Sequence, residues 1–221
     1  MLRTIDPGLD ELRALALQMG SLCQTILAKA LRALVTRNRE LALEVHRDDL
    51  EIDRLDLRID EAVLRLLATQ TPVAQDLREV VATKGIAMEL ERVGDLARNI
   101  ARSAERLSER RQVEIPAELS QLAEESSALL AESLRCFASL DSDAAREVLR
   151  ADDAVDRDEA RLIQHALAEM RSHPEVSPQE VDFIFVARNL ERVADHATNV
   201  AEDVVLIAEA QNLKHEAKLA R

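Results

Sequence analysis

The sequence consists of long stretches in which apolar residues recur every three or four positions. Such spacing places apolar side chains along one face of an α-helix. A proline or a short polar break begins most of these stretches, and proline is tolerated in the first helical turn because its missing N–H would have no partner there. The pattern predicts six helices, at residues 7–36, 39–69, 72–110, 116–139, 142–171 and 178–217.

Two of these helices begin with recognisable capping residues. Asp141 or Ser142 is suited to cap the fifth helix, since a short side-chain oxygen accepts a hydrogen bond from an unpaired amide. Ser177 and Glu180 have the spacing of a capping box at the start of the sixth helix. We therefore expect side-chain caps at both positions.

The third helix and the sixth helix share one pattern. Apolar steps of four and three alternate along residues 86–107, as in knobs-into-holes packing, and the same steps recur along 186–207, one hundred residues later. The polar residues also agree, because residues 90–95 (LERVGD) match residues 190–195 (LERVAD). Packing does not require identical polar residues, so the match indicates an internal duplication.

A second match, at an offset of 103, relates the second helix to the fifth. The matched residues are Asp49, Asp53 and Arg54 with Asp152, Asp156 and Arg157. The sequence therefore predicts an all-α fold of two tandem three-helix bundles, with six long antiparallel helices and an internal pseudo-twofold repeat. We place the first repeat at residues 1–112 and the second at 113–221.

The composition agrees with a helical protein and restricts its partners. Of 221 residues only 1% are aromatic, and 4 Gly and 5 Pro are too few to punctuate a many-stranded β fold. The net charge of −13 argues against nucleic acid as a direct partner. It fits a bound cation or a basic partner better than nucleic acid, although most acidic proteins are simply soluble and have neither.

The termini and cysteines indicate a cytoplasmic protein. The first seven residues lack the apolar core of a signal peptide, and no uninterrupted apolar run approaches the ~20 residues that span a bilayer. Cys23 and Cys136 lie in Leu- and Ala-rich helical sequence without a CxxC spacing. We expect both to be buried thiols in a reducing compartment.

Each half carries two pairs of carboxylates spaced four residues apart. The pairs are Asp49/Asp53 and Glu91/Asp95 in the first half, and Asp152/Asp156 and Glu191/Asp195 in the second. A step of four places both carboxylates on one helix face about 6 Å apart, where like charges cost a few tenths of a kcal/mol. A bound cation or a basic partner would offset that cost.

The pattern also predicts where these acids point. Glu91 and Asp95 fall on the side away from the apolar seam, and Asp49 and Asp53 fall on a flank of their helix. We expect four carboxylates per half to meet on one exposed ridge that suits hard cations such as Mg²⁺, Mn²⁺ or iron. His196 would add a nitrogen ligand in the second half. The alternative is an ordinary solvated helix face.

Other chemistry finds no support in the sequence. The four glycines are isolated and form no phosphate loop, and no histidine has a Glu three residues before it, as carboxylate-bridged di-iron bundles require. We therefore expect no enzymatic activity. Gly85 and Gly94 lie inside the third helix, where each lowers helix stability by about 1 kcal/mol relative to Ala. They either allow close helix approach or reflect neutral drift.

The polar segments resemble one known family. Residues 72–78 (PVAQDLR) and 90–101 (LERVGDLARNIA) resemble the first repeat of the PhoU proteins, and residues 190–201 (LERVADHATNVA) resemble the second. The resemblance implies six helices in two bundles. It also implies a cytoplasmic regulator that acts with the ATPase of the phosphate ABC transporter and with a sensor histidine kinase, and that keeps the phosphate-starvation response low when phosphate is plentiful.

The resemblance further implies a metal site and an assembly. Some family members bind iron or zinc clusters through Glu/Asp-x-x-x-Asp pairs, and these map here onto Asp49, Asp53, Glu91, Asp95, Asp152, Asp156, Glu191 and Asp195. The metal is then one of Fe, Zn, Mn or Mg. A homodimer is implied as well, with the membrane reached only through partners. The competing hypothesis is a metal-buffering or general helical scaffold protein unrelated to phosphate.

Two departures from the family bear on detail. Leu206 and Ala210 stand where the family often has Tyr and Gly, before the basic ending at Lys214 and His215. The second half also has residues 174–178 (PEVSP) in place of the PVAQDLR segment. We expect the two halves to differ in their partner contacts.

Overall fold

The computed structural model describes residues 5–214, which form six long α-helices, one short 3-10 helix and no strand. The all-α prediction is therefore confirmed. The helices are α1 (Asp6–Thr36), α2 (Arg39–Gln70), α3 (Gln75–Ser108), α4 (Ala117–Ser139), α5 (Ser142–Ser172) and α6 (Ser177–Glu209), with η1 (Pro174–Val176) between α5 and α6.

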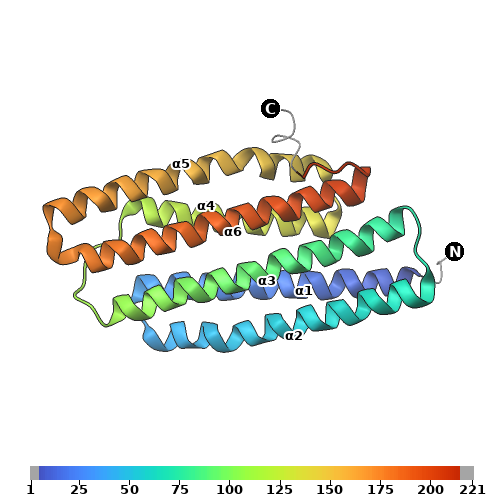
Figure 1. Cartoon of the computed structure of the whole chain (residues 1–221), viewed down its shortest axis with the longest axis horizontal. Coiled ribbons are helices and arrows are strands. Elements are labelled where there is room, and N and C mark those ends of the chain that lie inside the picture. The colour runs from blue at the N-terminus through green and yellow to red at the C-terminus, as the bar shows by residue number, and fades with distance from the viewer. Residues whose placement is uncertain (1–4, 215–221) are drawn as a thin grey trace.

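The helices form two three-helix bundles that lie side by side (Figure 1). Helices α1, α2 and α3 form the first bundle, and α4, α5 and α6 form the second. Successive helices run antiparallel, and α3 packs against α6 at the centre of the molecule in the opposite direction. The second bundle is thus inverted relative to the first, as the predicted pseudo-twofold repeat requires.

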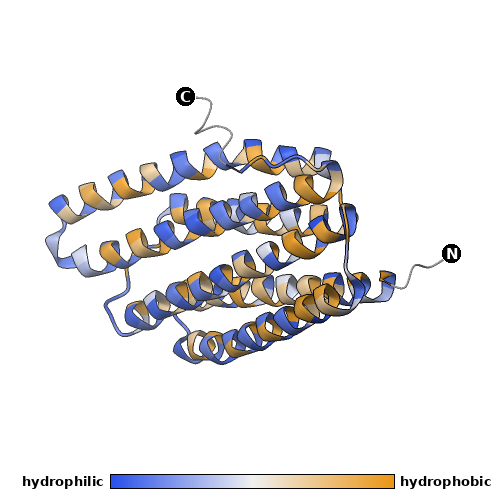
Figure 2. Cartoon of the chain, turned by 45° about the vertical axis from the view of Figure 1, so that its right-hand side comes forward, coloured by the Kyte–Doolittle hydropathy of each residue, from blue (hydrophilic) through white to orange (hydrophobic). Residues whose placement is uncertain are grey.

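Each helix buries one apolar stripe in a core that is continuous across both bundles. Hydrophobic and hydrophilic segments alternate along the helices in Figure 2, as amphipathic helices require. Leu90 and Val93 of α3 and Leu190 and Val193 of α6 are fully buried, which confirms the two seams. Within residues 5–214, α1 alone has the length and composition of a membrane span, a test that buried core helices also pass.

One of the two predicted helix caps is confirmed and the other is wrong. The side chain of Asp141 accepts a 3.0 Å hydrogen bond from the Ala144 amide, so this cap is confirmed. The capping box is wrong, because α6 already begins at Ser177 after η1 and no side chain caps it.

Two helix ends differ from the prediction by three residues or more, the start of α3 and the end of α6. Helix α3 begins at Gln75 rather than at residue 72, since Thr71 and Ala74 have positive φ angles of 47° and 48° that break the helix. Helix α6 ends at Glu209 with Ala210 in a left-handed cap. Residues 215–217 of the predicted sixth helix, including His215, lie outside the described residues.

Side chains from both bundles hold the segment that connects them. Arg37, at the α1–α2 turn, donates hydrogen bonds to the carbonyl oxygens of Leu107, Arg110 and Val113 over 3.1, 3.4 and 3.2 Å. From the other bundle, Gln179 donates to the Arg111 carbonyl over 3.0 Å. The connecting segment is therefore held by both repeats.

Polar contacts also join α3 directly to α6. The Nδ1 atom of His196 lies 2.6 Å from Glu89 Oε2, to which Asn199 also donates over 3.1 Å. Near the other end of the contact, Arg106 donates to the buried Asp182 over 2.7 Å. These contacts fix the register of the two repeats.

Candidate functional site

The eight predicted acids fall into two clusters, one in each bundle. Each cluster lies between an outer helix and a central helix, α2 with α3 in the first repeat and α5 with α6 in the second. We call them the first and the second acidic cluster. The first contains Asp49, Asp53, Glu91 and Asp95, and the second contains Asp152, Asp156, Glu191 and Asp195.

In the first acidic cluster an arginine bridges the two helices. Arg98 of α3 donates through Nη1 to Asp49 of α2 and through Nη2 to Asp95 of its own helix. Arg98 is 31% exposed, whereas the Asp49 side chain is 3% exposed. The guanidinium thus neutralises one buried and one half-buried carboxylate.

The prediction that Asp49 lies on an exposed flank is wrong. Asp49 precedes the seam residue Ile52 by one helical turn, so it points toward α3 rather than into solvent. Burial raises the pKa of Asp49 and the Arg98 charge opposes that rise. Gly94 makes the approach possible, because a β-carbon at that position would lie 2.9 Å from Asp49 Oδ1.

Two further cations neutralise carboxylates in and beside the first acidic cluster. Arg92 forms intrahelical ion pairs, 3.4 Å from Glu91 and 3.7 Å from Asp95. Lys84 of α3 pairs with Asp56 and Asp60 of α2 over 2.9 and 2.6 Å. Burial raises the pKa of Glu91 and Arg92 opposes it, while Asp95, Asp56 and Asp53 raise it further. The prediction that Glu91 and Asp95 are surface groups holds in part, because each side chain is about one-third exposed.

The second acidic cluster lacks the bridging arginine. Thr198 occupies the position that corresponds to Arg98, and its hydroxyl donates to the Asp195 carbonyl instead. Burial, with the charges of Asp195 and Asp156, raises the pKa of Asp152 to about 6. Burial, with Asp195, Glu159 and Asp156, raises the pKa of Glu191 to about 7. The carboxylates of the second acidic cluster therefore repel one another with less compensating positive charge than those of the first.

The geometry and the chemistry of the two acidic clusters bear differently on metal binding. Among residues 5–214, no three His, Cys, Asp or Glu side chains are placed to hold an ion together. Oxygen donors whose mutual repulsion raises their pKa nevertheless match the chemistry of a hard cation. The second acidic cluster therefore fits a cation better than the first, where Arg98 already supplies the positive charge.

His196 does not join the second acidic cluster. Its ring pairs with Glu89 of α3 at the contact between the two repeats, which rules out the predicted role as a nitrogen ligand in this conformation. The reason is geometric, since one residue along a helix turns the side chain by about 100° away from its neighbour Asp195.

Sequence reasoning missed the cations that organise these clusters. Arg98 follows Asp95 by three residues on the same helix face, and this spacing is a signal for an ion pair. Lys84 and the Arg188–Glu159 contact of 3.8 Å were missed as well. These contacts link different helices, so spacing along one helix gives no indication of them.

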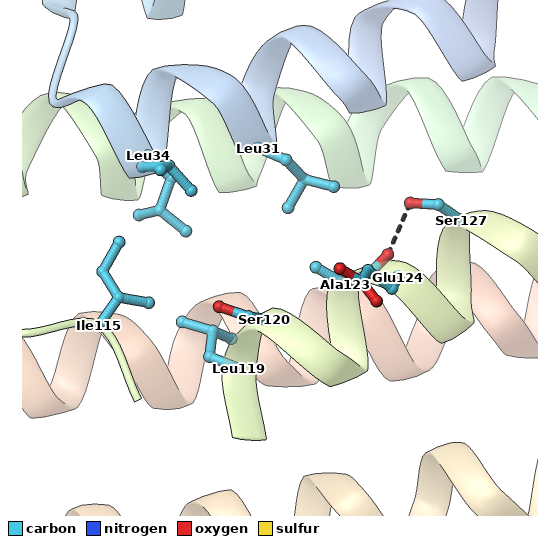
Figure 3. A pocket seen from close by; sticks show the side chains of 9 residues that line it. Leu31, Leu34, Ile115, Leu119, Ser120, Ala123, Glu124 and Ser127 are labelled. Atoms are coloured by element: carbon cyan, nitrogen blue, oxygen red, sulfur yellow. Dashed lines mark hydrogen bonds between the residues drawn. The ribbon is translucent and has the colours of Figure 1, made fainter. Parts of the chain in front are cut away.

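A separate apolar groove lies on the α1–α4 side of the molecule. Its volume is about 510 Å³, and its lining includes Leu31 and Leu34 of α1, Ile115 just before α4, and Leu119 in the first turn of α4. Figure 3 shows these side chains facing one another, with only Ser120, Glu124 and Ser127 adding polar atoms. None of the predicted site residues lines this groove, and it contains no converging charged groups.

Comparison with known sequences places the chain among related proteins. The PhoU domain profile matches residues 16–104 and 119–204. The phosphate-specific transport system accessory protein PhoU homolog of Pseudomonas aeruginosa is 31% identical over 210 residues, which covers 94% of this chain and 86% of that protein. The Clostridium acetobutylicum homolog is 31% identical over 206 residues, covering 93% and 94% respectively.

Solved structures agree with the sequence comparison. The crystal structure of PhoU from Pseudomonas aeruginosa matches with a TM-score of 0.91 and 30% identity, covering 94% of this chain and 100% of that one. The phosphate transport system regulatory protein PhoU from Streptococcus pneumoniae matches with a TM-score of 0.88 and 27% identity, covering 96% and 100%. The arrangement of all six helices is therefore common to these proteins.

Proposed function

This chain belongs to the PhoU family, and we propose that it acts as an adaptor between the phosphate ABC transporter and a sensor histidine kinase. In this role it lowers the phosphate-starvation response when phosphate is plentiful. It works in the cytoplasm, reaches the membrane only through its partners, and catalyses no reaction itself. The observation that carries the proposal is the match of both repeats to a family whose members are named for phosphate-specific transport.

The acidic clusters support a role for cations in this function. Each repeat keeps the same four carboxylates although most surrounding surface positions differ, and like charges at this spacing oppose folding. We place the stronger cation site at the second acidic cluster, where Asp152, Asp156, Glu191 and Asp195 would have to move closer together to hold an ion. A bound Fe, Zn, Mn or Mg ion would supply positive charge there. The first acidic cluster would bind a cation more weakly, because Arg98 already supplies positive charge there. Its four acids are Asp49, Asp53, Glu91 and Asp95.

A binding experiment tests the adaptor role. The purified chain is immobilised and presented with the transporter ATPase and with the cytoplasmic part of the kinase, in Mn²⁺ and in chelator. We expect both proteins to be retained, more strongly with Mn²⁺. Failure of both to bind under either condition contradicts the proposal.

Matched variants separate the cation from the rest of the surface. Glu191→Ala with Asp195→Ala removes a carboxylate pair from the second acidic cluster. Asp143→Ala with Glu147→Ala removes an exposed pair of the same spacing at the start of α5, and so serves as the control. Only the first variant should lose the Mn²⁺-dependent part of partner binding.

A genetic measurement addresses the competing hypothesis of a metal buffer or general scaffold. Deletion of the gene should raise transcription from a phosphate-starvation promoter in high phosphate. Unchanged transcription after deletion would favour the metal-buffering or scaffold role and reject regulation.

A further inference from the structure

A pocket lies at the end of the second bundle where α4 and α6 begin and α5 ends (Figure 1). Its volume is about 550 Å³, which is within the range of sites for small organic molecules. Three helices line it with ionisable side chains, which are Glu118 of α4, His165 and Glu169 of α5, and Glu180 of α6. We call it the end pocket. None of these residues belongs to either acidic cluster.

The first repeat shows that the fold does not require ionisable residues at these four places. Its counterparts, at the offsets of 103 and 100 that relate the repeats, are apolar and buried. They are Leu15 for Glu118, Ala62 for His165, Leu66 for Glu169 and Val80 for Glu180. The same places therefore form core in one bundle and a charged pocket in the other.

The corresponding space in the first repeat is much smaller. A pocket of about 110 Å³ there is lined by Ala62 and Leu66, and by Glu11, which pairs with Arg65 over 3.0 Å. In the second repeat the counterpart of Glu11 is Glu114, which also lines the end pocket, and the counterpart of Arg65 is an alanine. The end pocket is thus both larger and more acidic than its equivalent.

Glu180 is the buried member of the end pocket. The residue is 4% exposed, and no residue between 5 and 214 donates a hydrogen bond to its Oε2 atom. Carboxylates are favoured in the first turn of a helix, yet no side-chain cap forms at the start of α6. Burial raises the pKa of Glu180, with Glu169 adding to the rise and His165 opposing it. A cationic ligand would recover the free energy that this burial costs.

Carboxylates outnumber imidazoles around the end pocket by two. The Nδ1 atom of His165 lies 3.6 Å from Glu118 Oε1, and that of His173 lies 3.1 Å from Glu169 Oε2. The lining carboxylates are Glu114, Glu118, Glu169 and Glu180. Even with both imidazoles protonated, a ligand with at least two positive charges matches this surface.

The shape of the end pocket favours an organic cation over a metal ion. In the part of the chain that the structure describes, no three acidic or histidine side chains are placed to hold an ion together. The carboxylates come from three helices and from the α3–α4 connection, and Val113, Ile115 and Val176 add apolar surface. Separated positive charges on an aliphatic chain fit this combination of carboxylates and apolar surface.

We propose that the end pocket binds an aliphatic polyamine, a small molecule with two or more ammonium groups on an alkyl chain. The ammonium groups donate hydrogen bonds to the carboxylates, including Glu180, and the methylene groups pack against Val113, Ile115 and Val176. The bound molecule also contacts the α3–α4 connection, where Arg37 of the first bundle donates to the Val113 carbonyl.

Calorimetric titration of the full chain with spermidine tests the end pocket. Excess Mg²⁺ is present throughout, because it screens the net charge of −13 and occupies sites for simple divalent cations. We expect one spermidine per chain, and about tenfold or more weaker binding of n-butylamine, which carries a single charge. Spermidine should also raise the melting temperature, since it binds the folded state.

Matched variants assign the binding to these residues. Glu169→Gln with Glu180→Gln removes two charges from the end pocket, keeps the side-chain shapes and should weaken spermidine binding about tenfold or more. Asp143→Asn with Glu147→Gln changes the net charge equally at exposed positions near the start of α5 and should bind as the wild type does.

Two further measurements separate binding from a structural role. Glu180→Gln alone should unfold at the same or a higher urea concentration than the wild type near neutral pH, because it removes a buried charge. In proton NMR, spermidine should shift the ring signals of His165. It should not shift those of His46, which pairs with Glu105 in the first bundle.

Three outcomes overturn the proposal. They are an absence of spermidine binding in Mg²⁺, equal losses in the two double variants, and binding of n-butylamine as tight as that of spermidine. None of these measurements uses the transporter ATPase or the kinase. The adaptor role and the polyamine site can therefore fail separately.

Discussion

Gly94 of α3 stands directly against Asp49 of α2. A β-carbon on residue 94 would lie 2.9 Å from Asp49 Oδ1 and 2.8 Å from Ile52 Cδ1, which is closer than real β-carbons approach other atoms. The glycine therefore explains how the buried Asp49 carboxylate on α2 reaches Arg98 on α3. The second repeat has Ala194 and Val155 at the positions of Gly94 and Ile52, and Thr198 in place of Arg98.

Gly94→Ala should destabilise the protein. Alanine gains about 1 kcal/mol of helix propensity, but the overlap with Asp49 and Ile52 should outweigh it and leave a net loss of about 1–2 kcal/mol. Urea unfolding followed by circular dichroism measures the change. Ile52→Val removes the Cδ1 atom, so G94A should cost less on the I52V background than on the wild type. Equal costs on both backgrounds would contradict the steric explanation.

Arg98→Thr introduces the residue that the second repeat has at this position. It should destabilise the protein more than Gly94→Ala, because it leaves Asp49 buried without its cation. Removing one partner of a buried pair costs about 3–5 kcal/mol, and the partial exposure of Arg98 reduces the expectation to about 2–4 kcal/mol near pH 7. The loss should shrink as the pH falls, since burial raises the pKa of Asp49 and protonation removes the unpaired charge. Arg92→Thr is the control, because Arg92 is 61% exposed and should change the unfolding free energy by less than about 0.5 kcal/mol.

Glu191→Gln should stabilise the metal-free protein only at higher pH. The folded state raises the pKa of Glu191 from 4.5 to about 7, so its stabilising contribution is complete below pH 4.5 and is lost as the pH rises through 7. The variant should gain about 1–2 kcal/mol over the wild type near pH 8, discounted because the side chain is partly solvated, and nothing near pH 4.5. Thermal unfolding in chelator across this range measures it.

The control for this pH prediction is Glu147→Gln at a 71% exposed site on the same bundle. This variant should leave the pH dependence of the melting temperature unchanged. A difference between E191Q and the wild type that is constant with pH would mean that the ionisation of Glu191 does not control the effect.

Cation binding should depend more on the second acidic cluster than on the first. In calorimetric titration with Mn²⁺, E191A/D195A should weaken binding by tenfold or more, about 1.4 kcal/mol. E91A/D95A should have the smaller effect, since Arg98 already neutralises that cluster, and both variants should keep their helicity. The control D143A/E147A should bind as the wild type does. Equal losses in all three variants would indicate diffuse attraction by the net charge of −13 rather than a site.

Much of the fold was predictable because its signals are local. Apolar spacing and proline positions located all six helices, and the start of α2 at Arg39 and of α5 at Ser142 are as predicted. The duplication predicted which helices are equivalent. The start of α3 was wrong because positive φ angles at Thr71 and Ala74 are set by the turn, which apolar spacing does not describe.

The candidate site was predictable only in part. Spacing along one helix correctly paired Glu91 with Asp95, but the burial of Asp49 depends on Arg98 and Gly94, which come from another helix. The exposed row of leucines on α2 (Leu43, Leu50, Leu57 and Leu64) was missed for a related reason. Helix α2 has two apolar lines, and a single sequence does not reveal which of them meets the core and which meets solvent.

Because the second bundle is inverted, the two interhelical connections that differ in sequence between the repeats lie far apart. The turn at Pro72–Ala74 lies at one end of the molecule, and the turn at Pro174–Val176 lies at the opposite end (Figure 1). Helices of about 33 residues set these ends roughly 50 Å apart, and Arg37 keeps the connection between the halves from opening. The paired central helices α3 and α6 run between these two ends, so a shift of α3 against α6 would connect a protein bound at one end to a protein bound at the other.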